Sequence, residues 1–172
     1  MKTSPDFTTL PKYYNHYVMQ VHDQYLLEAL EQSGKLLLQT LNAVPEDMGE
    51  YRYEKGKWSI KELVNHMMDA ERIFAYRALR FARNDSTDLP AFEENDYAPQ
   101  ANAHARTLKQ LLIEVENLRK TTIDLFASFT PEMLQRKGTA NKNVISVINI
   151  GYIIAGHETH HRNVLSERYL KA

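Results

Sequence analysis

The sequence predicts an all-α protein, a four-helix bundle with an N-terminal arm and one short extra helical turn. Apolar residues recur at three-to-four spacing through long segments, capping motifs precede these segments, and no segment alternates apolar and polar residues as a strand does. The 172 residues are enough to bury a core without disulfides. We expect a single domain over 1–172, with an arm over 1–22 and the bundle over 23–170.

The first segment lacks sustained helical periodicity and is rich in aromatic residues, so we expect an arm that lies over the bundle. A first helix is predicted from about Asp23 to Asn42, where leucines repeat at helical spacing. Gly34 is a weak point inside this helix, costing about 1 kcal/mol relative to alanine. The arm carries two prolines and four aromatic residues, Pro5, Pro11, Phe7, Tyr13, Tyr14 and Tyr17.

The second helix has the strongest start signal in the chain. Ser59 and Glu62 have the spacing of a capping box, in which each side chain accepts a backbone N–H of the first turn. Trp58 before the cap and Leu63 after it are expected to form a hydrophobic staple. The apolar stripe that follows carries the helix to about Arg83.

A second capping box, Thr107 with Gln110, starts the third helix, which continues through Phe126. Thr130 and Pro131 suit the cap and first position of the short extra turn. Four helices joined in this way are typical of a helical bundle.

Three segments are predicted as loops. Pro45–Lys57 contains a proline, two glycines and mixed charges. Asp85–Gln100 contains two prolines and forms a long connection, and Gly138–Asn143 forms a polar loop. Ser146 is then expected to cap a last long helix that ends near Tyr169.

Acidic and basic residues nearly balance, with 22 Asp and Glu, 21 Lys and Arg and a formal net charge of −1. Nucleic acid is therefore not an expected partner. Arginines crowd the second helix, but acidic residues alternate with them, which indicates a solvated helix face. These residues are Arg72, Arg77, Arg80 and Arg83, with Asp69, Glu71 and Asp85.

The chain has no cysteine, which excludes disulfides, thiolate metal ligands and a cysteine nucleophile. Met1–Pro11 lacks the basic start and apolar run of a secretory signal, and no apolar stretch approaches about 18 residues. We expect a cytoplasmic protein with no membrane partner.

Two histidines of the last helix point to a metal site. At 100° per residue, His157 and His161 lie within about 40° of each other. Burying two imidazoles without partners costs free energy, so either a metal ion binds both or each forms a hydrogen bond across the core. Both share their arc with apolar residues, Ile150, Ile153, Ile154 and Val164.

The other histidines differ in how well their positions suit a metal ligand. His66 borders the apolar face of the second helix and can turn toward a neighbouring helix, although a lone histidine there is more often a core residue. His160 lies at the edge of the apolar face and is a reserve ligand. We expect the remaining three at the surface, His16, His22 and His104.

Glu71 falls inside the apolar arc of the second helix and is a candidate buried carboxylate. It is expected to orient a ligand histidine, to act as a general base, or to pair with an arginine of a neighbouring helix. On the long connection, four residues are candidate substrate contacts, with a solvated acidic loop as the alternative. They are Glu93, Glu94, Asp96 and Tyr97.

Several motifs together resemble the DinB-like (YfiT/DinB) superfamily. Lys57-Trp58-Ser59-Ile60-Lys61-Glu62, His66 and Asp69-Ala70-Glu71-Arg72 are similar to its second-helix motif, and Ala155-Gly156-His157-Glu158-Thr159-His160-His161 to its last-helix motif. The resemblance extends to Ala75–Leu79, Leu89–Tyr97 and Glu167–Leu170.

The resemblance implies an up-down-down-up four-helix bundle that holds one divalent metal ion on three histidines. Carried onto this chain, the ligands are His66, His157 and His161. The family includes metal-dependent hydrolases and also transferases or isomerases that use low-molecular-weight thiols. Members are often dimers, so a homodimer is expected.

Three histidine ligands leave a coordination position open for water or substrate, which favours a catalytic site. We expect a metal-dependent hydrolase or a thiol-dependent S-transferase that acts on a small molecule. The candidate metals are zinc and nickel, with manganese and iron as further candidates, and a low-molecular-weight thiol is a candidate cosubstrate. The alternative is a non-catalytic metal-binding module for stress response or interaction.

Overall fold

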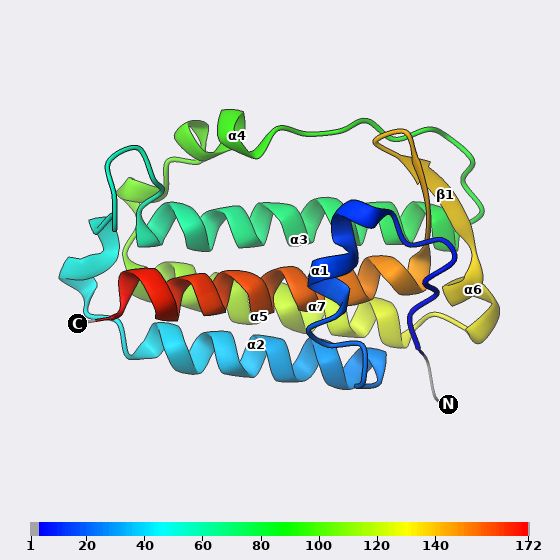
Figure 1. The fold of residues 1–172 in the computed structure, drawn as a ribbon, viewed down its shortest axis with the longest axis horizontal. Coiled ribbons are helices and arrows are strands. Elements are labelled where there is room, and N and C mark those ends of the chain that lie inside the picture. The colour runs from blue at the N-terminus through cyan, green and yellow to red at the C-terminus, as the bar shows by residue number, and fades with distance from the viewer. Residues whose placement is uncertain (1–3, 172) are drawn as a thin grey trace.

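Four long helices run side by side in the computed structural model, which describes residues 4–171 (Figure 1). The last helix packs against the first two, and the third packs against the same two. Figure 1 shows the first and last helices running in one direction and the other two in the opposite direction, so the order is up-down-down-up. The predicted four-helix bundle is confirmed. Its helices are α2 (Leu26–Asn42), α3 (Ile60–Ala82), α5 (Leu108–Ala127) and α7 (Val147–Val164).

Side-chain caps start α3, α5 and α7 where the sequence predicts, whereas α2 begins at Leu26, three residues later than predicted, without a side-chain cap. Ser59 with Glu62, and Thr107 with Gln110, form complete capping boxes at α3 and α5. The Ser146 hydroxyl accepts the backbone N–H of residue 149 at the start of α7. The predicted extra turn is also present: Thr130 caps α6 (Pro131–Gln135), and Leu165–Tyr169 continues α7 as a π-helical turn.

The core follows the inward faces of these helices. Leu30 and Leu37 of α2, together with Ile150 and Ile153 of α7, are fully buried. Each such side chain contributes about 1.5–3 kcal/mol when removed from water. This packing fixes α7, which bears two of the candidate histidines, between α2 and α3.

The N-terminal arm lies over the bundle, as the sequence predicts. It contains a 3-10 turn, Lys12–Tyr14, and the short helix α1 (Asn15–Val18), which packs on α7. Both are too short to show periodicity. Residues 1–3 of the predicted arm, and residue 172 of the predicted domain, lie outside the described residues.

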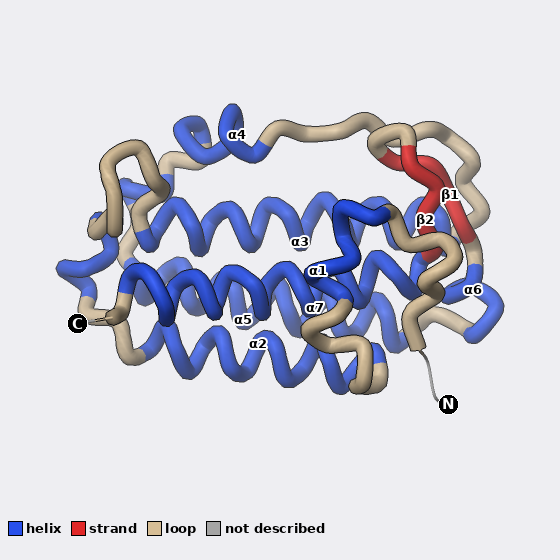
Figure 2. Tube along the Cα trace, viewed as in Figure 1, coloured by secondary structure: helices blue, strands red, loops and turns tan. Residues whose placement is uncertain are grey.

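The sequence prediction of no β-structure is wrong for one short segment, shown red in Figure 2. The predicted loop after α6 is a hairpin of β1 (Lys137–Ala140) and β2 (Asn143–Ser146). Its register pairs Lys137 with Ser146 and Ala140 with Asn143. Both turn residues have positive φ, 49° at Asn141 and 62° at Lys142, as the tightest hairpin turns require. Backbone pairing rather than alternating apolar side chains forms these strands, which explains why the sequence pattern missed them.

The long connection after α3 is also more ordered than predicted. It contains α4 (Glu94–Gln100), started by the Glu93 carboxylate, which accepts the Asn95 backbone N–H at 3.2 Å. Before α4, the backbone of Leu89 pairs with β1, which draws the connection over α3. Two further 3-10 turns, Glu46–Glu50 and Ala103–Ala105, complete the connections.

No helix among residues 4–171 combines the length and the apolar character that a membrane crossing needs.

Candidate metal centre

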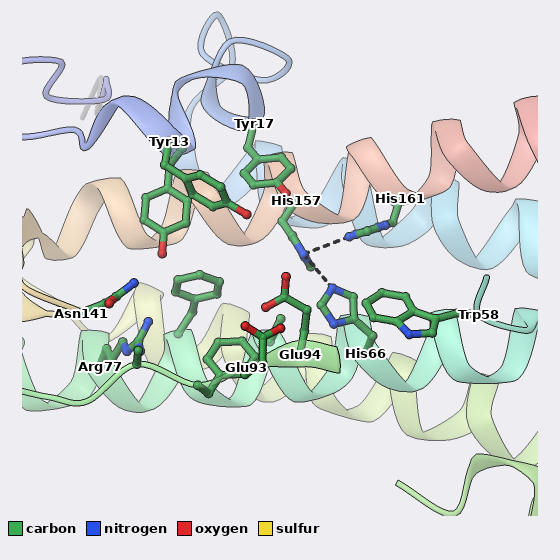
Figure 3. A pocket seen from close by; sticks show the side chains of 15 residues that line it. Tyr13, Tyr17, Trp58, His66, Arg77, Glu93, Glu94, Asn141, His157 and His161 are labelled. Carbon is green, nitrogen blue, oxygen red and sulfur yellow. Dashed lines mark hydrogen bonds between the residues drawn. The ribbon is translucent and has the colours of Figure 1, made fainter. Parts of the chain in front are cut away.

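Three imidazoles from two helices converge at one point between α3 and α7. Nε2 of His157 lies 3.2 Å from Nε2 of His66 and 3.0 Å from Nε2 of His161. One ligand atom from each ring falls within 4.8 Å of the other two. The structure therefore brings together the three histidines that the sequence selected, and Figure 3 shows them facing one another.

The spacing of these nitrogens suits a single small cation. Two nitrogens bound to one tetrahedral zinc ion at 2.0–2.1 Å lie about 3.3 Å apart. The two Nε2 contacts of His157 are close to that value. Nδ1 of His161 is buried and has no hydrogen-bond partner in the described part of the chain, so the polar contact of this ring is made by Nε2.

Neighbouring side chains hold the rings in place. The Ser59 cap fixes the start of α3 two turns before His66, and the Trp58 indole packs on the His66 ring with a centroid separation of 4.6 Å. The edge of Tyr17 in the arm meets the His157 ring at 5.2 Å. Aromatic packing of this kind restricts the ring orientations without competing for the nitrogens.

Burial keeps the three imidazoles neutral. It lowers the pKa of His66 to about 4, and it lowers the pKa values of His157 and His161 well below the usual range, with the neighbouring histidines adding to the effect. Neutral imidazole is the form that binds metal ions. At pH 7 the rings therefore carry no positive charge that would oppose a bound cation.

A cavity of about 460 Å³ opens beside the histidines, within the size range of small-molecule sites. Its wall combines aromatic and polar side chains, and Trp58, Phe74 and Phe92 contribute rings from three parts of the chain. Three tyrosines of the arm also line it, Tyr13, Tyr14 and Tyr17.

The acidic residues of the long connection fall into two groups. Glu93 and Glu94 line this cavity, and Figure 3 shows Glu94 beside the histidine cluster. Asp96 and Tyr97 line a different hollow on the outer face of α3, together with Arg72. Of the predicted substrate contacts, the structure places Glu93 and Glu94 at the site and the other two away from it.

Glu71 lies in the core beside a buried arginine of α5. Its carboxylate accepts two hydrogen bonds from Arg119, at 3.0 Å from Nε and 2.9 Å from Nη2. Arg119 also donates to Glu158 of α7 at 2.5 Å. Of the alternatives predicted for Glu71, the structure contains the ion pair with an arginine of a neighbouring helix.

The other histidines lie outside the cluster. His160 is half-buried and packs its ring near His16 and Tyr17 of the arm. Three histidines predicted at the surface are exposed: His16, His22 and His104. His104 contacts the carboxylates of Glu50 and Glu62.

Sequence reasoning missed two polar cavity residues, Arg77 and Asn141. The prediction of a solvated arginine face is wrong for Arg77, which is only 5% exposed. A signal was present, because Arg77 follows His66 by eleven residues, or about three helical turns on the same face. Asn141 could not be found in this way, since the hairpin that positions it was not predicted.

Comparison with known proteins identifies the family. The model of the DinB superfamily matches residues 29–165, which is more than half of the chain. The chain belongs to the DinB superfamily. The three converging histidines thus lie within the segment that matches the family model.

Two similar proteins carry hydrolase descriptions. A protein of Oceanobacillus iheyensis named "Putative metal-dependent hydrolase OB0413" is 29% identical over 139 residues, covering 78% of this chain and 78% of that protein. YfiT from Bacillus subtilis, described as "a probable metal-dependent hydrolase with an unusual four-helix bundle topology", superposes with a TM-score of 0.71. The match covers 96% of this chain and 91% of that one at 16% identity, and so shows the shared fold.

Proposed function

We propose that this DinB superfamily member is a metal-dependent hydrolase of a small molecule, with one divalent ion bound by His66, His157 and His161. The convergence of three neutral imidazoles, two buried and one partly buried, on the wall of a 460 Å³ cavity carries the proposal. The hydrolase names of two similar proteins support the same reaction class.

The Nε2 atoms of His66, His157 and His161 would hold a divalent ion, with the His66 ring braced by Trp58. Such an ion would supply Lewis-acid chemistry for the activation of water and of a substrate carbonyl or phosphoryl group. The aromatic walls bind the apolar part of the substrate and exclude bulk water. The Glu94 carboxylate faces the cavity and accepts hydrogen bonds from substrate donors.

Two alternatives use the same ion differently. A low-molecular-weight thiol held as thiolate would make the protein an S-transferase, and a module without activity would bind the ion alone. Nickel, manganese and iron are alternatives to zinc for this ligand set. The proposed homodimer is a separate prediction, tested by light scattering.

Metal content of the purified protein tests the ligand assignment. We expect about one ion per chain in the wild type, strongly reduced in His157→Ala and His161→Ala. His160→Ala is the matched control, since it removes an imidazole from the same helix outside the cluster, and we expect it to retain the metal. Loss of metal in His160→Ala with retention in His161→Ala would show that the ligands are wrong.

A substrate screen tests the reaction class. Esters, amides and phosphoesters are incubated with the zinc-, nickel-, manganese- and iron-loaded protein, with and without thiols. Turnover without thiol that disappears in His157→Ala supports hydrolysis, whereas turnover only with thiol identifies the S-transferase. Failure to take up any of the four metals at neutral pH would refute the proposal.

A further inference from the structure

Two arginines of this protein have equally small exposed fractions, but their surroundings differ. Arg77 and Arg119 are each 5% exposed. Arg119 is held between the carboxylates of Glu71 and Glu158. Among the described residues, no carboxylate lies within the 4.0 Å ion-pair distance of the Arg77 guanidinium. A buried cation without an anionic partner is costly and therefore marks a candidate binding site.

The immediate contacts of Arg77 leave its charge uncompensated. Nη2 donates to the carbonyl oxygen of Pro90 at 2.8 Å, and the guanidinium carbon lies 5.6 and 5.9 Å from the ring centroids of Phe74 and Phe92. Burial lowers the pKa of Arg77, with the nearby Tyr14 opposing the effect. These groups fix the position of the guanidinium, but they do not neutralise it.

Arg77 forms part of the wall of the same cavity as the histidines. Figure 3 shows Arg77 and Asn141 at one end, the histidines at the other, and Glu94 between them. Arg77 and His66 are eleven residues apart on α3, about 16 Å along the helix axis. One small molecule can therefore meet both ends of the cavity.

The geometry points to an anion-binding subsite formed by Arg77 and Asn141, which holds a carboxylate or phosphate group of the substrate at the end opposite the histidines. Two N–H groups of a guanidinium match two oxygens of either anion, and the Asn141 amide adds a donor. Glu93 and Glu94 repel a second negative charge in the middle of the cavity. The substrate class is thus a small molecule with its negative charge at one end and its reacting bond at the other.

This inference rests on the proposed function for the role of the histidines, but the subsite itself can be measured separately. The probes are 3-phenylpropionate, phenyl phosphate and the neutral 3-phenylpropionamide. Each is titrated into zinc-loaded and metal-free protein, with binding followed by calorimetry and by the NMR signal of the Arg77 Nε–H. The anion that binds more tightly identifies the group.

Arg77→Gln is expected to weaken binding of the favoured anion about tenfold or more and to leave binding of the amide unchanged. Arg72→Gln is the matched control, because it removes an arginine from the same helix outside the cavity, and it should bind like the wild type. Arg77→Lys keeps the charge but loses the two parallel N–H donors of the guanidinium. Its affinity for the anion should therefore fall between those of the wild type and Arg77→Gln. Zinc content should be equal in all variants.

Equal affinity of wild type and Arg77→Gln for both anions would overturn the subsite, as would amide binding as tight as anion binding. An Arg77 Nε–H signal that does not move at saturating anion would overturn it even if Arg77→Gln fails to fold. A protein that takes up no metal but binds the anion through Arg77 would refute the hydrolase and retain the subsite. Normal metal uptake without anion binding through Arg77 would refute the subsite and retain the proposed hydrolase.

Discussion

Gly156 lies directly against the main chain of Tyr17. A Cβ at Gly156 would come within 2.5 Å of the Tyr17 carbonyl carbon and closer still to its oxygen. Only glycine lets the arm approach α7 this closely, one residue before His157. The contact positions the Tyr17 ring at the edge of His157, so a glycine of the last helix helps to close the candidate site.

Gly156→Ala should therefore lower the free energy of unfolding by about 2–3 kcal/mol, since backbone cannot rotate away from the added methyl group. Gly151→Ala is the control on the same helix: its Cβ would meet the ends of the Leu26 and Phe126 side chains, which can shift, and we expect a smaller loss. Amide hydrogen exchange in α1 should be faster in Gly156→Ala than in the wild type, and unchanged in Gly151→Ala. Unchanged exchange in that variant would show that the arm does not depend on this contact.

Gly34→Ala tests a case in which helix propensity and packing predict opposite signs. Propensity favours alanine by about 1 kcal/mol. However, the new Cβ would lie 2.9 Å from Cγ of Arg119, whose Nη1 is fixed by the Leu30 carbonyl and by Ser33. We expect a net loss of about 1–2 kcal/mol in denaturant unfolding. Gln32→Ala, on the exposed side of α2, should be nearly neutral, and a more stable Gly34→Ala would contradict the packing argument.

Glu62 makes the stability of α3 depend on pH. Burial alone raises its pKa, but hydrogen bonds from Arg52 and from the Ser59 backbone outweigh burial and lower the pKa below its usual value. A lowered folded-state pKa stabilises the fold above the unfolded pKa of about 4.3, and this stabilisation is lost as the pH falls through the folded value.

Glu62→Gln keeps a capping-box side chain and removes the charge, so at pH 7 it should cost about 1 kcal/mol of unfolding free energy. Urea unfolding is measured from pH 7 to pH 3. The difference in unfolding free energy between Glu62→Gln and the wild type should shrink below about pH 5. Glu116→Gln removes a carboxylate from an exposed pair with Lys120 and should change little. A constant difference across this range would contradict the charge-based explanation.

Local signals made most of the bundle predictable. Ser59 with Glu62 marks the start of α3 because the capping box uses residues three apart, and the four-residue spacing places His157 and His161 on one face. Each of these patterns involves residues three or four positions apart, which is about one turn of helix. They were sufficient for the four long helices and for the two histidines of α7.

What the sequence missed depends on contacts between distant segments. Arg77 was interpreted as solvent-facing because its helix carries many charges. The connection around Pro90 in fact covers Arg77. The periodicity of a single helix cannot reveal a contact of this kind with another segment. Asn141 reaches the cavity only through a hairpin held by main-chain pairing. The placement of Glu94 likewise depends on Leu89 pairing with β1.

The buried pairing of Arg119 yields the last prediction. Arg119 of α5 joins Glu71 of α3 to Glu158 of α7, the two helices that carry the candidate metal ligands. Arg119→Met leaves two carboxylates in the core without a counter-charge, and removing one side of a buried pair typically costs about 3–5 kcal/mol. We expect a loss of that size in urea unfolding at pH 7.

The matched control is Arg106→Met, which breaks a more exposed pair with Glu114 and should cost less than about 1 kcal/mol. Replacing the whole cluster, as in Arg119→Met with Glu71→Gln and Glu158→Gln, should recover part of the loss, because the variant no longer buries unpaired charge. A triple variant less stable than Arg119→Met would show instead that the glutamates stabilise the bundle through contacts other than this arginine. In that case, the link between α3 and α7 would have to be sought in their direct packing rather than in Arg119.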